Sequence, residues 1–178
     1  ATLGTATTPQ HVHTLLRQTD RIVFCFDGDA AGRRAAWRAL ENALPLLSDT
    51  RRLDFLFLPE GHDPDSFIRS EGLDRFEAAV EEAMPLSVFL VRELCRRVDL
   101  GTPEGRARLQ AELKPLVRAM PDIALRGQIA LEAASRAGVG AQELLRYVGL
   151  RVAPPAPPRR EPWRDRPAPV PAALRSRA

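Results

Sequence analysis

Lysine is nearly absent from this chain of 178 residues. Of its 26 basic residues only Lys114 is a lysine, and the other 25 are arginines. A GC-rich genome produces the same bias without any selection for phosphate binding, so the abundance of arginine alone indicates no ligand. Apolar residues make up 44% of the chain, which is enough to build a sizeable core in one domain or in two small ones.

Cysteine and long apolar runs are also scarce. The two cysteines, Cys25 and Cys95, are too few for a disulfide framework, and no Cys/His cluster with zinc-ligand spacing occurs. We therefore expect a reducing, cytoplasmic setting. No stretch reaches the roughly 18 consecutive apolar residues of a membrane-spanning helix, so we expect no membrane partner.

Positive charge and proline are concentrated at one end of the chain. Residues 151–178 hold seven arginines against two acids, a net of +5, so residues 1–150 carry −2 of the total of +3. The net positive charge therefore gives no reason to expect nucleic-acid binding by the folded body. Eight of the 16 prolines also lie between Pro154 and Pro171. This composition predicts a disordered Pro/Arg-rich segment over residues 151–178, either a flexible linker or a plain C-terminal tail.

The most informative segment is an apolar run that ends in two acids. Residues 22–26 (Ile-Val-Phe-Cys-Phe) are β-branched and aromatic, which predicts a buried strand. Asp27 and Asp29 follow at the carboxyl end of that strand, where α/β sheets place their ligands. Two carboxylates this close repel each other unless a cation lies between them. Because hard cations prefer carboxylate oxygens, the pattern predicts a Mg²⁺ or Mn²⁺ site.

A second acidic cluster follows a second predicted strand. After a helical pattern over residues 30–47, residues 53–58 are again apolar, and Glu60, Asp63 and Asp65 come just after them. A connection of this length between two strands implies a parallel pair and a right-handed crossover. The carboxyl ends of both strands then meet at one edge of the sheet, so we expect the two acidic clusters to lie together.

Residues 85–150 carry only helical patterns. Two apolar stripes recur at helical spacing, and we expect them to form a core in preference to a partner-binding groove. The stripes are Leu109, Leu113, Leu116, Val117 and Met120, and Leu125, Ile129 and Ala133. The chain is thus predicted to divide into an α/β unit (1–84), an all-α helical subdomain (85–150) and the Pro/Arg-rich segment (151–178).

Two other interpretations of Asp27-Gly-Asp-Ala-Ala-Gly32 compete with a Mg²⁺ or Mn²⁺ site at the strand end. An EF-hand loop is excluded, because its fifth and twelfth positions fall on Ala31 and Arg38 and the entering element is a strand. Helix capping suits Asp29, since a carboxylate at the N-cap accepts backbone N–H groups and faces the positive end of the helix dipole. Capping leaves Asp27 unexplained, so we favour a metal site.

A phosphatase interpretation also stays open. Haloacid-dehalogenase-like phosphatases place an Asp-x-Asp at a strand end, where the first Asp is the nucleophile and the second a general acid. The local context of Asp27 and Asp29 fits this arrangement. The downstream lysine that neutralises the phosphoryl group is missing, however, because Lys114 lies deep in the helical region.

An ordered set of motifs resembles the TOPRIM domain of bacterial replicative DNA primases. The motifs are ATLGTA (1–6), FDGDAAG with the following AA (26–36), FLPEGHDPDS (57–66), EAMPLS (82–87) and DLGTPEGRA (99–107). The Asp-Gly-Asp alone is weak evidence, whereas the ordered set at matching separations points to primases over topoisomerase and nuclease relatives. The resemblance covers roughly residues 1–150.

The resemblance implies a TOPRIM-like α/β fold with a parallel sheet, incomplete at its N-terminal side. It further implies a primase, a DNA-directed RNA polymerase that makes short RNA primers on a single-stranded DNA template from ribonucleoside triphosphates. By motif match, Asp27 and Asp29 are the catalytic residues and ligands of Mg²⁺ or Mn²⁺. Asp63 and Asp65 match the second acidic pair of the same metal site.

Phosphate contacts are expected beside these acids. Gly28 and Gly32 let the chain turn sharply and let phosphate approach the backbone. Arg33 follows the loop directly and is a candidate phosphate contact. A solvated arginine on a helix face explains Arg33 equally well, so both interpretations stay open.

The resemblance also implies parts that this sequence does not contain. In the family, a strand ending in a catalytic glutamate precedes the position of Ala1, and a zinc-binding domain, a template-gripping subdomain and a C-terminal helicase-binding domain complete the enzyme. We therefore expect an internal segment of a primase that acts at the replication fork, makes no primers alone, and reaches zinc and the replicative helicase only through those other parts. A non-catalytic docking or DNA-contacting module is the main alternative.

Overall fold

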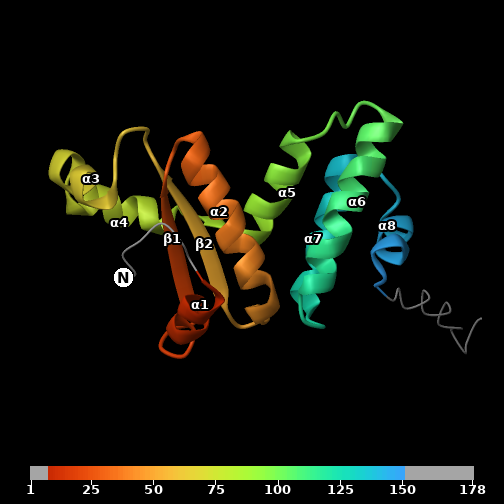
Figure 1. The fold of residues 1–178 in the computed structure, drawn as a ribbon, viewed down its shortest axis with the longest axis horizontal. Helices are drawn as coiled ribbons and strands as arrows, with labels where there is room; N and C mark the ends of the chain where they lie inside the picture. The colour runs from red at the N-terminus through yellow and green to blue at the C-terminus, as the bar shows by residue number, and fades with distance from the viewer. Residues whose placement is uncertain (1–7, 151–178) are drawn as a thin grey trace, which may run out of the picture.

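A computed structural model describes residues 8–150 of the chain. The ATLGTA motif (1–6) and the predicted disordered segment over residues 151–178 lie outside the described residues. The elements in chain order are α1 (Pro9–Leu15), β1 (Arg21–Asp27), α2 (Ala30–Ala43), η1 (Leu44–Leu46), β2 (Arg52–Leu58), α3 (Pro64–Glu71), α4 (Leu73–Glu81), β3 (Met84–Pro85), α5 (Leu86–Arg96), α6 (Pro103–Ala119), α7 (Ala124–Ala137) and α8 (Ala141–Val148). Figure 1 shows α3 and α4 at one end, α6 to α8 at the other, and the sheet with α2 between them.

The sheet has the strand order β1-β2-β3. β1 and β2 are parallel, with Arg21 opposite Arg52 and Asp27 opposite Leu58, so the predicted parallel pair is confirmed. β3 runs antiparallel to β2, so the described sheet is mixed, where a parallel sheet was predicted. A strand of two residues has no side-chain periodicity for sequence analysis to detect. Pro85 donates no ladder hydrogen bond, which suits the edge of a sheet.

Both faces of the sheet are covered. Ile22, Phe24 and Phe55 belong to the main core with the apolar sides of α1, α2 and α5. Leu56 and Leu58 point to the other face and belong to a smaller cluster with side chains of α3 and α4. Burial on both faces explains why the two long strands are continuously apolar instead of alternating with polar residues.

The helical region shares its core with the sheet. The ring of Phe89 on α5 stacks 4.6 Å from that of Phe55 on β2, centroid to centroid, and lies 5.4 Å from that of Phe57. The predicted stripes of α6 and α7 belong to the same cluster, which runs from Val12 to Val148. The stripes are therefore core, as predicted. The proposed boundary at residue 84 stays a prediction, and no break in the described core accompanies it.

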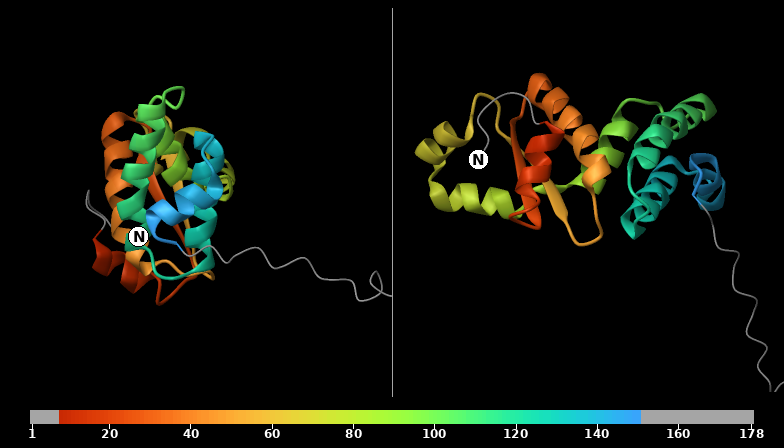
Figure 2. Two further views of the ribbon diagram at one scale, coloured as in Figure 1. Left: turned by 90° about the vertical axis from the view of Figure 1, so that its right-hand side faces the viewer. Right: turned by 60° about the horizontal axis from the view of Figure 1, so that its bottom comes forward.

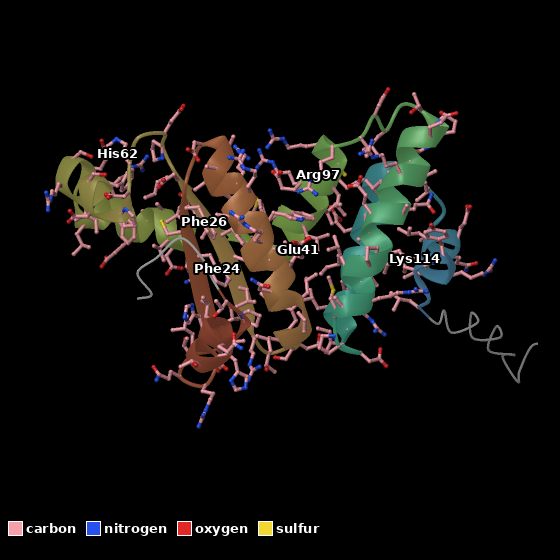
Figure 3. All side chains as sticks on the ribbon, in the orientation of Figure 1. Phe24, Phe26, Glu41, His62, Arg97 and Lys114 are labelled. Atoms are coloured by element: carbon pink, nitrogen blue, oxygen red, sulfur yellow. The ribbon has the colours of Figure 1, made fainter. Side chains whose placement is uncertain are left out.

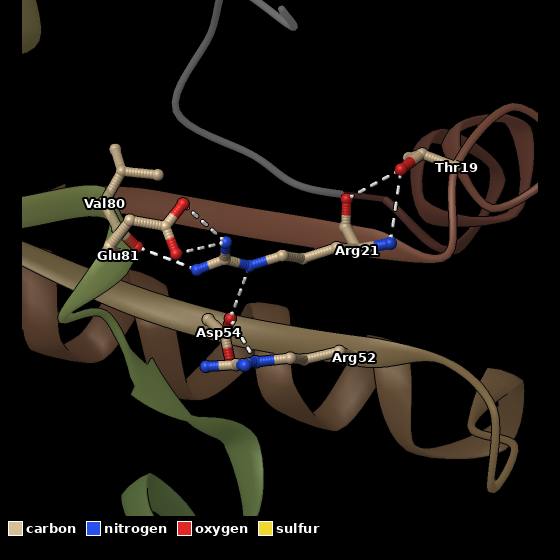
Figure 4. Close-up of polar contacts among 6 residues, drawn as sticks. All are labelled: Thr19, Arg21, Arg52, Asp54, Val80 and Glu81. Atoms are coloured by element: carbon tan, nitrogen blue, oxygen red, sulfur yellow. Dashed lines mark hydrogen bonds and ion pairs between the residues drawn. The ribbon is translucent and has the colours of Figure 1, made fainter. Parts of the chain in front are cut away.

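A buried carboxylate ties β1, β2 and α4 together (Figure 4). Asp54 on β2 is the one charged side chain that is buried among residues 8–150. Its carboxylate accepts hydrogen bonds from Arg21 at 3.1 Å and from Arg52 at 3.0 Å. Arg21 also reaches both carboxylate oxygens of Glu81 at 2.9 Å. The charge of Asp54 is thus paired, which is the condition for burying it.

The molecule is extended along one axis, as the two turned views confirm (Figure 2). From residue 8 to residue 150, none of the helices combines the length and the apolar character needed to cross a bilayer. Both cysteines are free thiols.

Candidate metal site

The end of β1 places two carboxylates at the start of α2. Asp27 closes the strand, and Asp29 is the N-cap of α2, where its Oδ1 accepts the N–H of Gly32 at 2.6 Å. The predicted capping role of Asp29 is thereby confirmed. A Cβ at Gly28 would lie 2.4 Å from the carbonyl oxygen of Leu58, and one at Gly32 would lie 2.1 Å from that of Asp27. Only glycine fits at these two positions, so the loop holds both carboxylates beside the end of β2.

The end of β2 places a third carboxylate at the start of α3. Asp63 is the N-cap of α3, and its Oδ1 accepts the N–H of Ser66 at 2.7 Å, while the hydroxyl of Ser66 accepts the N–H of Asp63 at 2.9 Å. Hydrogen bonding to the Asp63 carboxylate, from the backbone of Ser66 first and then from its side chain, lowers the pKa of Asp63 below its ordinary value. Asp63 is therefore a stable anion at neutral pH.

One pocket joins the two strand ends. It has a volume of about 400 Å³ and is lined by Asp27, Asp29, Glu60, Gly61, His62, Asp63 and Ser66. The structure thus brings together both acids of the first cluster and two of the three acids of the second. We call this pocket the acidic pocket. It has four carboxylates and no lysine or arginine among its lining residues, so it attracts cations.

Asp65 stands apart from the acidic pocket. Its carboxylate pairs with Arg69 one turn along α3, at 2.7 Å, and both side chains are mostly exposed. Asp65 is also absent from the lining of the pocket. Its role as a metal ligand stays a prediction.

His62 lines the acidic pocket and was not singled out by sequence analysis. Its Nδ1 is buried and has no hydrogen-bond partner in the structure. The imidazole meets the ring of Phe67 edge-on, with centroids 5.9 Å apart, and lies beside α3 in Figure 3. A buried imidazole nitrogen without a partner is uncommon and suits a ligand. The sequence motif did not indicate a ligand-binding histidine, because a histidine in a polar loop is equally compatible with simple exposure to solvent.

The donor set fits a hard divalent cation that is shared with substrate. Within the described part of the chain, no three Asp, Glu, His or Cys side chains are arranged as a complete metal-binding group. Mg²⁺ is ordinarily held by one or two carboxylates together with water and substrate phosphates, so it needs no all-protein cage. Asp27, Asp29 and Asp63 supply carboxylates of that kind.

The remaining predicted residues lie around this site. The guanidinium of Arg33 lies 5.5 Å from the ring centroid of Phe57 and 3.5 Å from the carboxylate of Glu93 on α5, so it turns toward α5 and does not line the acidic pocket. Its predicted phosphate contact stays a prediction. Behind the site, burial and then the charge of Asp27 raise the pKa of the Cys25 thiol to about 11, which makes this thiol a poor nucleophile.

The acidic pocket lies in the part of the chain that matches a known family. Residues 1–68 match a family described as Toprim-like, and residues 87–142 match one described as the DnaB-helicase binding domain of primase. The DNA primase of Escherichia coli K12 is 50% identical over 139 residues, which are 78% of this chain and 24% of that protein. The chain belongs to the bacterial DNA primase family. It spans about a quarter of the length of this curated relative.

Solved primase structures share the fold of this segment. A structure of the DnaG catalytic core has a TM-score of 0.75 at 48% identity, over 79% of this chain and 46% of that one. A DnaG primase catalytic domain bound to single-stranded DNA has the same TM-score and identity, over 79% of this chain and 45% of that one. The TOPRIM-like fold inferred from the motifs is confirmed. These relatives also select primase over the phosphatase interpretation.

The second family match changes where helicase binding is expected. Sequence analysis assigned it to a domain outside this chain. The match over residues 87–142 instead covers nearly all of α5, the whole of α6 and α7, and the start of α8. The helical region of this primase segment therefore carries the similarity to a helicase-binding domain.

Proposed function

We propose that this chain supplies the metal-binding part of a primase catalytic core that joins ribonucleotides into RNA primers on single-stranded DNA. The acidic pocket carries the proposal, because Asp27 and Asp29 from β1 share it with Glu60 and Asp63 from the end of β2. The similarity to DNA primases, one of them solved with single-stranded DNA, supports the substrate class. The same role is proposed for the longer protein of which this segment is a part.

The chain's own residues prepare the site for phosphoryl transfer. A bound Mg²⁺ or Mn²⁺ would neutralise charge on the triphosphate and help to activate the attacking hydroxyl group. Asp27, Asp29 and Asp63 would hold the cation, and the N-cap hydrogen bonds orient the carboxylates of Asp29 and Asp63. His62 also lines the pocket, and its Nδ1 is buried without a hydrogen-bond partner in the structure.

Substitution in the intact primase tests the metal site. Asp27→Ala and Asp29→Ala should each lower templated ribonucleotide incorporation at least about 100-fold, a size typical for losing charge stabilisation in the transition state. Asp74→Ala is the matched control, because Asp74 is an exposed acid on α4 that does not line the acidic pocket. Mn²⁺ binding, measured by electron paramagnetic resonance, should weaken in the first two variants alone. Wild-type incorporation by Asp27→Ala would exclude that residue from the site.

We also propose that the helical region contacts the replicative helicase. The family match over residues 87–142 supports this partner, and Val88 and Leu131 are large apolar side chains within that range that remain exposed. In the intact primase, Val88→Glu with Leu131→Glu should weaken helicase binding at least about tenfold by size-exclusion or interferometry assays. Leu73→Glu is the control, because Leu73 is exposed but lies outside the matched range. Unchanged binding by the double variant would remove this surface from the interface.

A further inference from the structure

A second pocket lies between α2 and α5, and neither the metal site nor the family matches account for it. Its volume is about 320 Å³, and its lining residues are Arg33, Arg34, Trp37, Arg38, Glu93 and Arg97. His62 of the acidic pocket and Arg97 of this one lie on opposite sides of α2, toward the end of the sheet where β1 and β2 finish (Figure 3). The first turns of α2 therefore separate an acidic pocket from a basic one.

Most of the positive charge in this second pocket is not balanced. The carboxylate of Glu93 is engaged by Arg33 at 3.5 Å and by Arg96 at 3.1 Å. Arg34 and Arg38 are exposed and form no ion pair with any residue that the structure describes, and they are spaced i,i+4 along α2. Like charges at that spacing destabilise a helix. An anion bound here would therefore reduce the repulsion between Arg34 and Arg38, which no described side chain neutralises.

The third unbalanced cation, Arg97, is held in place by an aromatic ring. Its guanidinium lies 3.7 Å from the centroid of Trp37. Trp37 is itself fixed, because its Nε1 donates a hydrogen bond to Glu41 at 2.9 Å. Stacking of this kind orients the guanidinium plane before any ligand arrives, which lowers the entropy lost on binding.

We propose that Arg34, Arg38 and Arg97, gathered around Trp37, form a phosphate-binding subsite, which we call the arginine pocket. Guanidinium groups bind phosphate oxygens through paired, charge-assisted hydrogen bonds. Three guanidinium groups, two on α2 and one at the C-cap of α5, match consecutive phosphate groups better than they match a single anion. Those phosphates belong either to the backbone of a nucleic-acid strand or to the triphosphate of a free nucleotide. The subsite requires no metal and does not depend on the acidic pocket.

The experiment compares two triple variants of the full chain with equal loss of charge. Arg34→Gln, Arg38→Gln and Arg97→Gln remove the arginine pocket. Arg17→Gln, Arg75→Gln and Arg146→Gln are the control, because those arginines are exposed and form no side-chain ion pair with other described residues. Glutamine keeps helix propensity close to that of arginine, and thermal melts verify that both variants stay folded. The arginines of residues 151–178 are present in both triple variants, so any contribution they make to binding is the same in the two.

Binding is measured in EDTA, so that a failure of the metal site does not affect the result. One arm follows the anisotropy of a fluorescent single-stranded DNA oligonucleotide, and the other follows Trp37 emission on titration with ATP, in a Trp163→Phe background. We expect the pocket triple to lose at least about tenfold in affinity in one arm or both, and the control less than about twofold. For the oligonucleotide, the slope of log affinity against log salt should fall by about 2 for three phosphate contacts.

The two arms identify the source of the phosphates. Loss in the oligonucleotide arm alone assigns the arginine pocket to a strand backbone, and loss in the ATP arm alone assigns it to a nucleotide. Equal losses in the two triples would overturn the proposal, because general charge would then explain binding. So would unchanged affinity of the pocket triple in both arms.

Discussion

The guanidinium Nε of Arg21 donates a hydrogen bond to Oδ2 of Asp54 at 3.1 Å, across the parallel strands β1 and β2. This contact lies at the end of the strands opposite to the acidic pocket, since Arg21 is the first residue of β1 and Asp27 is the last. Arg21 extends the contact to Glu81 and to the carbonyl oxygen of Val80 on α4. The pairing of the two strands that carry the acids is thus fixed at their far ends by charge.

Removal of the buried carboxylate should destabilise the fold. Asp54→Ala leaves two arginines without their shared partner, and we expect it to lower the free energy of unfolding by about 2 kcal/mol. The cost stays below the ~3–5 kcal/mol typical of broken buried ion pairs, because the side chains of Arg21 and Arg52 are 31% and 54% exposed. Urea denaturation followed by circular dichroism measures the change. The exposed control Asp74→Ala should change it by less than about 0.5 kcal/mol, and an equal loss would contradict the role of Asp54.

Asp49 should make stability depend on pH. Its two carboxylate oxygens accept the N–H groups of Ala124 at 3.0 Å and Leu125 at 2.9 Å, and they cap α7, whose own N-cap residue provides no side-chain cap. These bonds, Leu125 first, lower the pKa of Asp49 in the folded state. The folded protein therefore binds the proton more weakly than the unfolded chain, so the stabilisation is complete above the unfolded pKa of about 4 and is lost as the pH falls through the lower folded pKa.

The matched variant for this cap is Asp49→Ala. We expect its melting temperature to lie a few degrees below wild type at pH 7, and the difference to shrink as the pH is lowered below about 4. The exposed control Glu77→Gln should show no comparable difference at either pH. A difference for Asp49→Ala that stays constant from pH 7 to pH 2 would contradict capping by the ionised carboxylate.

Two glycine substitutions should change the free energy of unfolding in opposite directions. In Gly32→Ala the new Cβ meets the carbonyl oxygen of Asp27 at 2.1 Å, so the acidic loop must move, and we expect a loss of about 1–3 kcal/mol together with lower primase activity. In Gly127→Ala, inside α7, the new Cβ meets nothing within 4 Å, and we expect a gain of about 0.5–1 kcal/mol with activity unchanged. Thermal unfolding and ribonucleotide incorporation separate the two cases. A stabilised Gly32→Ala would show that the loop is not tightly constrained.

Asp63 and Asp65 should differ in function although the sequence pairs them. Asp63→Asn removes a carboxylate from the acidic pocket, and we expect at least about a tenfold rise in the Mn²⁺ concentration needed for half-maximal primase activity. Asp65→Asn breaks the exposed pair with Arg69, and we expect less than about a threefold rise, because such pairs contribute little. A metal titration of both variants in the intact primase checks this. An equal rise of at least about tenfold in the half-maximal Mn²⁺ concentration of both variants would instead indicate that Asp65 also belongs to the metal site.

Much of the fold was predictable from local pattern. The apolar runs that end at Asp27 and near Leu58 are strands, and the acids that follow them lie at helix N-termini, because capping and burial act over a few neighbouring residues. The helical stripes in α6 and α7 are core for the same reason. The two-residue strand β3 was not predictable, since its pairing with β2 arises from the return of the chain after α4.

The sequence by itself determined the two acidic clusters, their strand-end positions and the family to which they belong. Only the tertiary structure decided which members share a pocket, because Asp63 at the end of β2 lines it together with Asp27 and Asp29, whereas Asp65 pairs with Arg69 along α3. It also decided that Arg97, far from α2 in sequence, stacks on Trp37 and completes the arginine pocket. Local sequence preferences determine the helix or strand on which a residue lies. The packing of α5 against α2 and β2 determines which side chains that residue contacts.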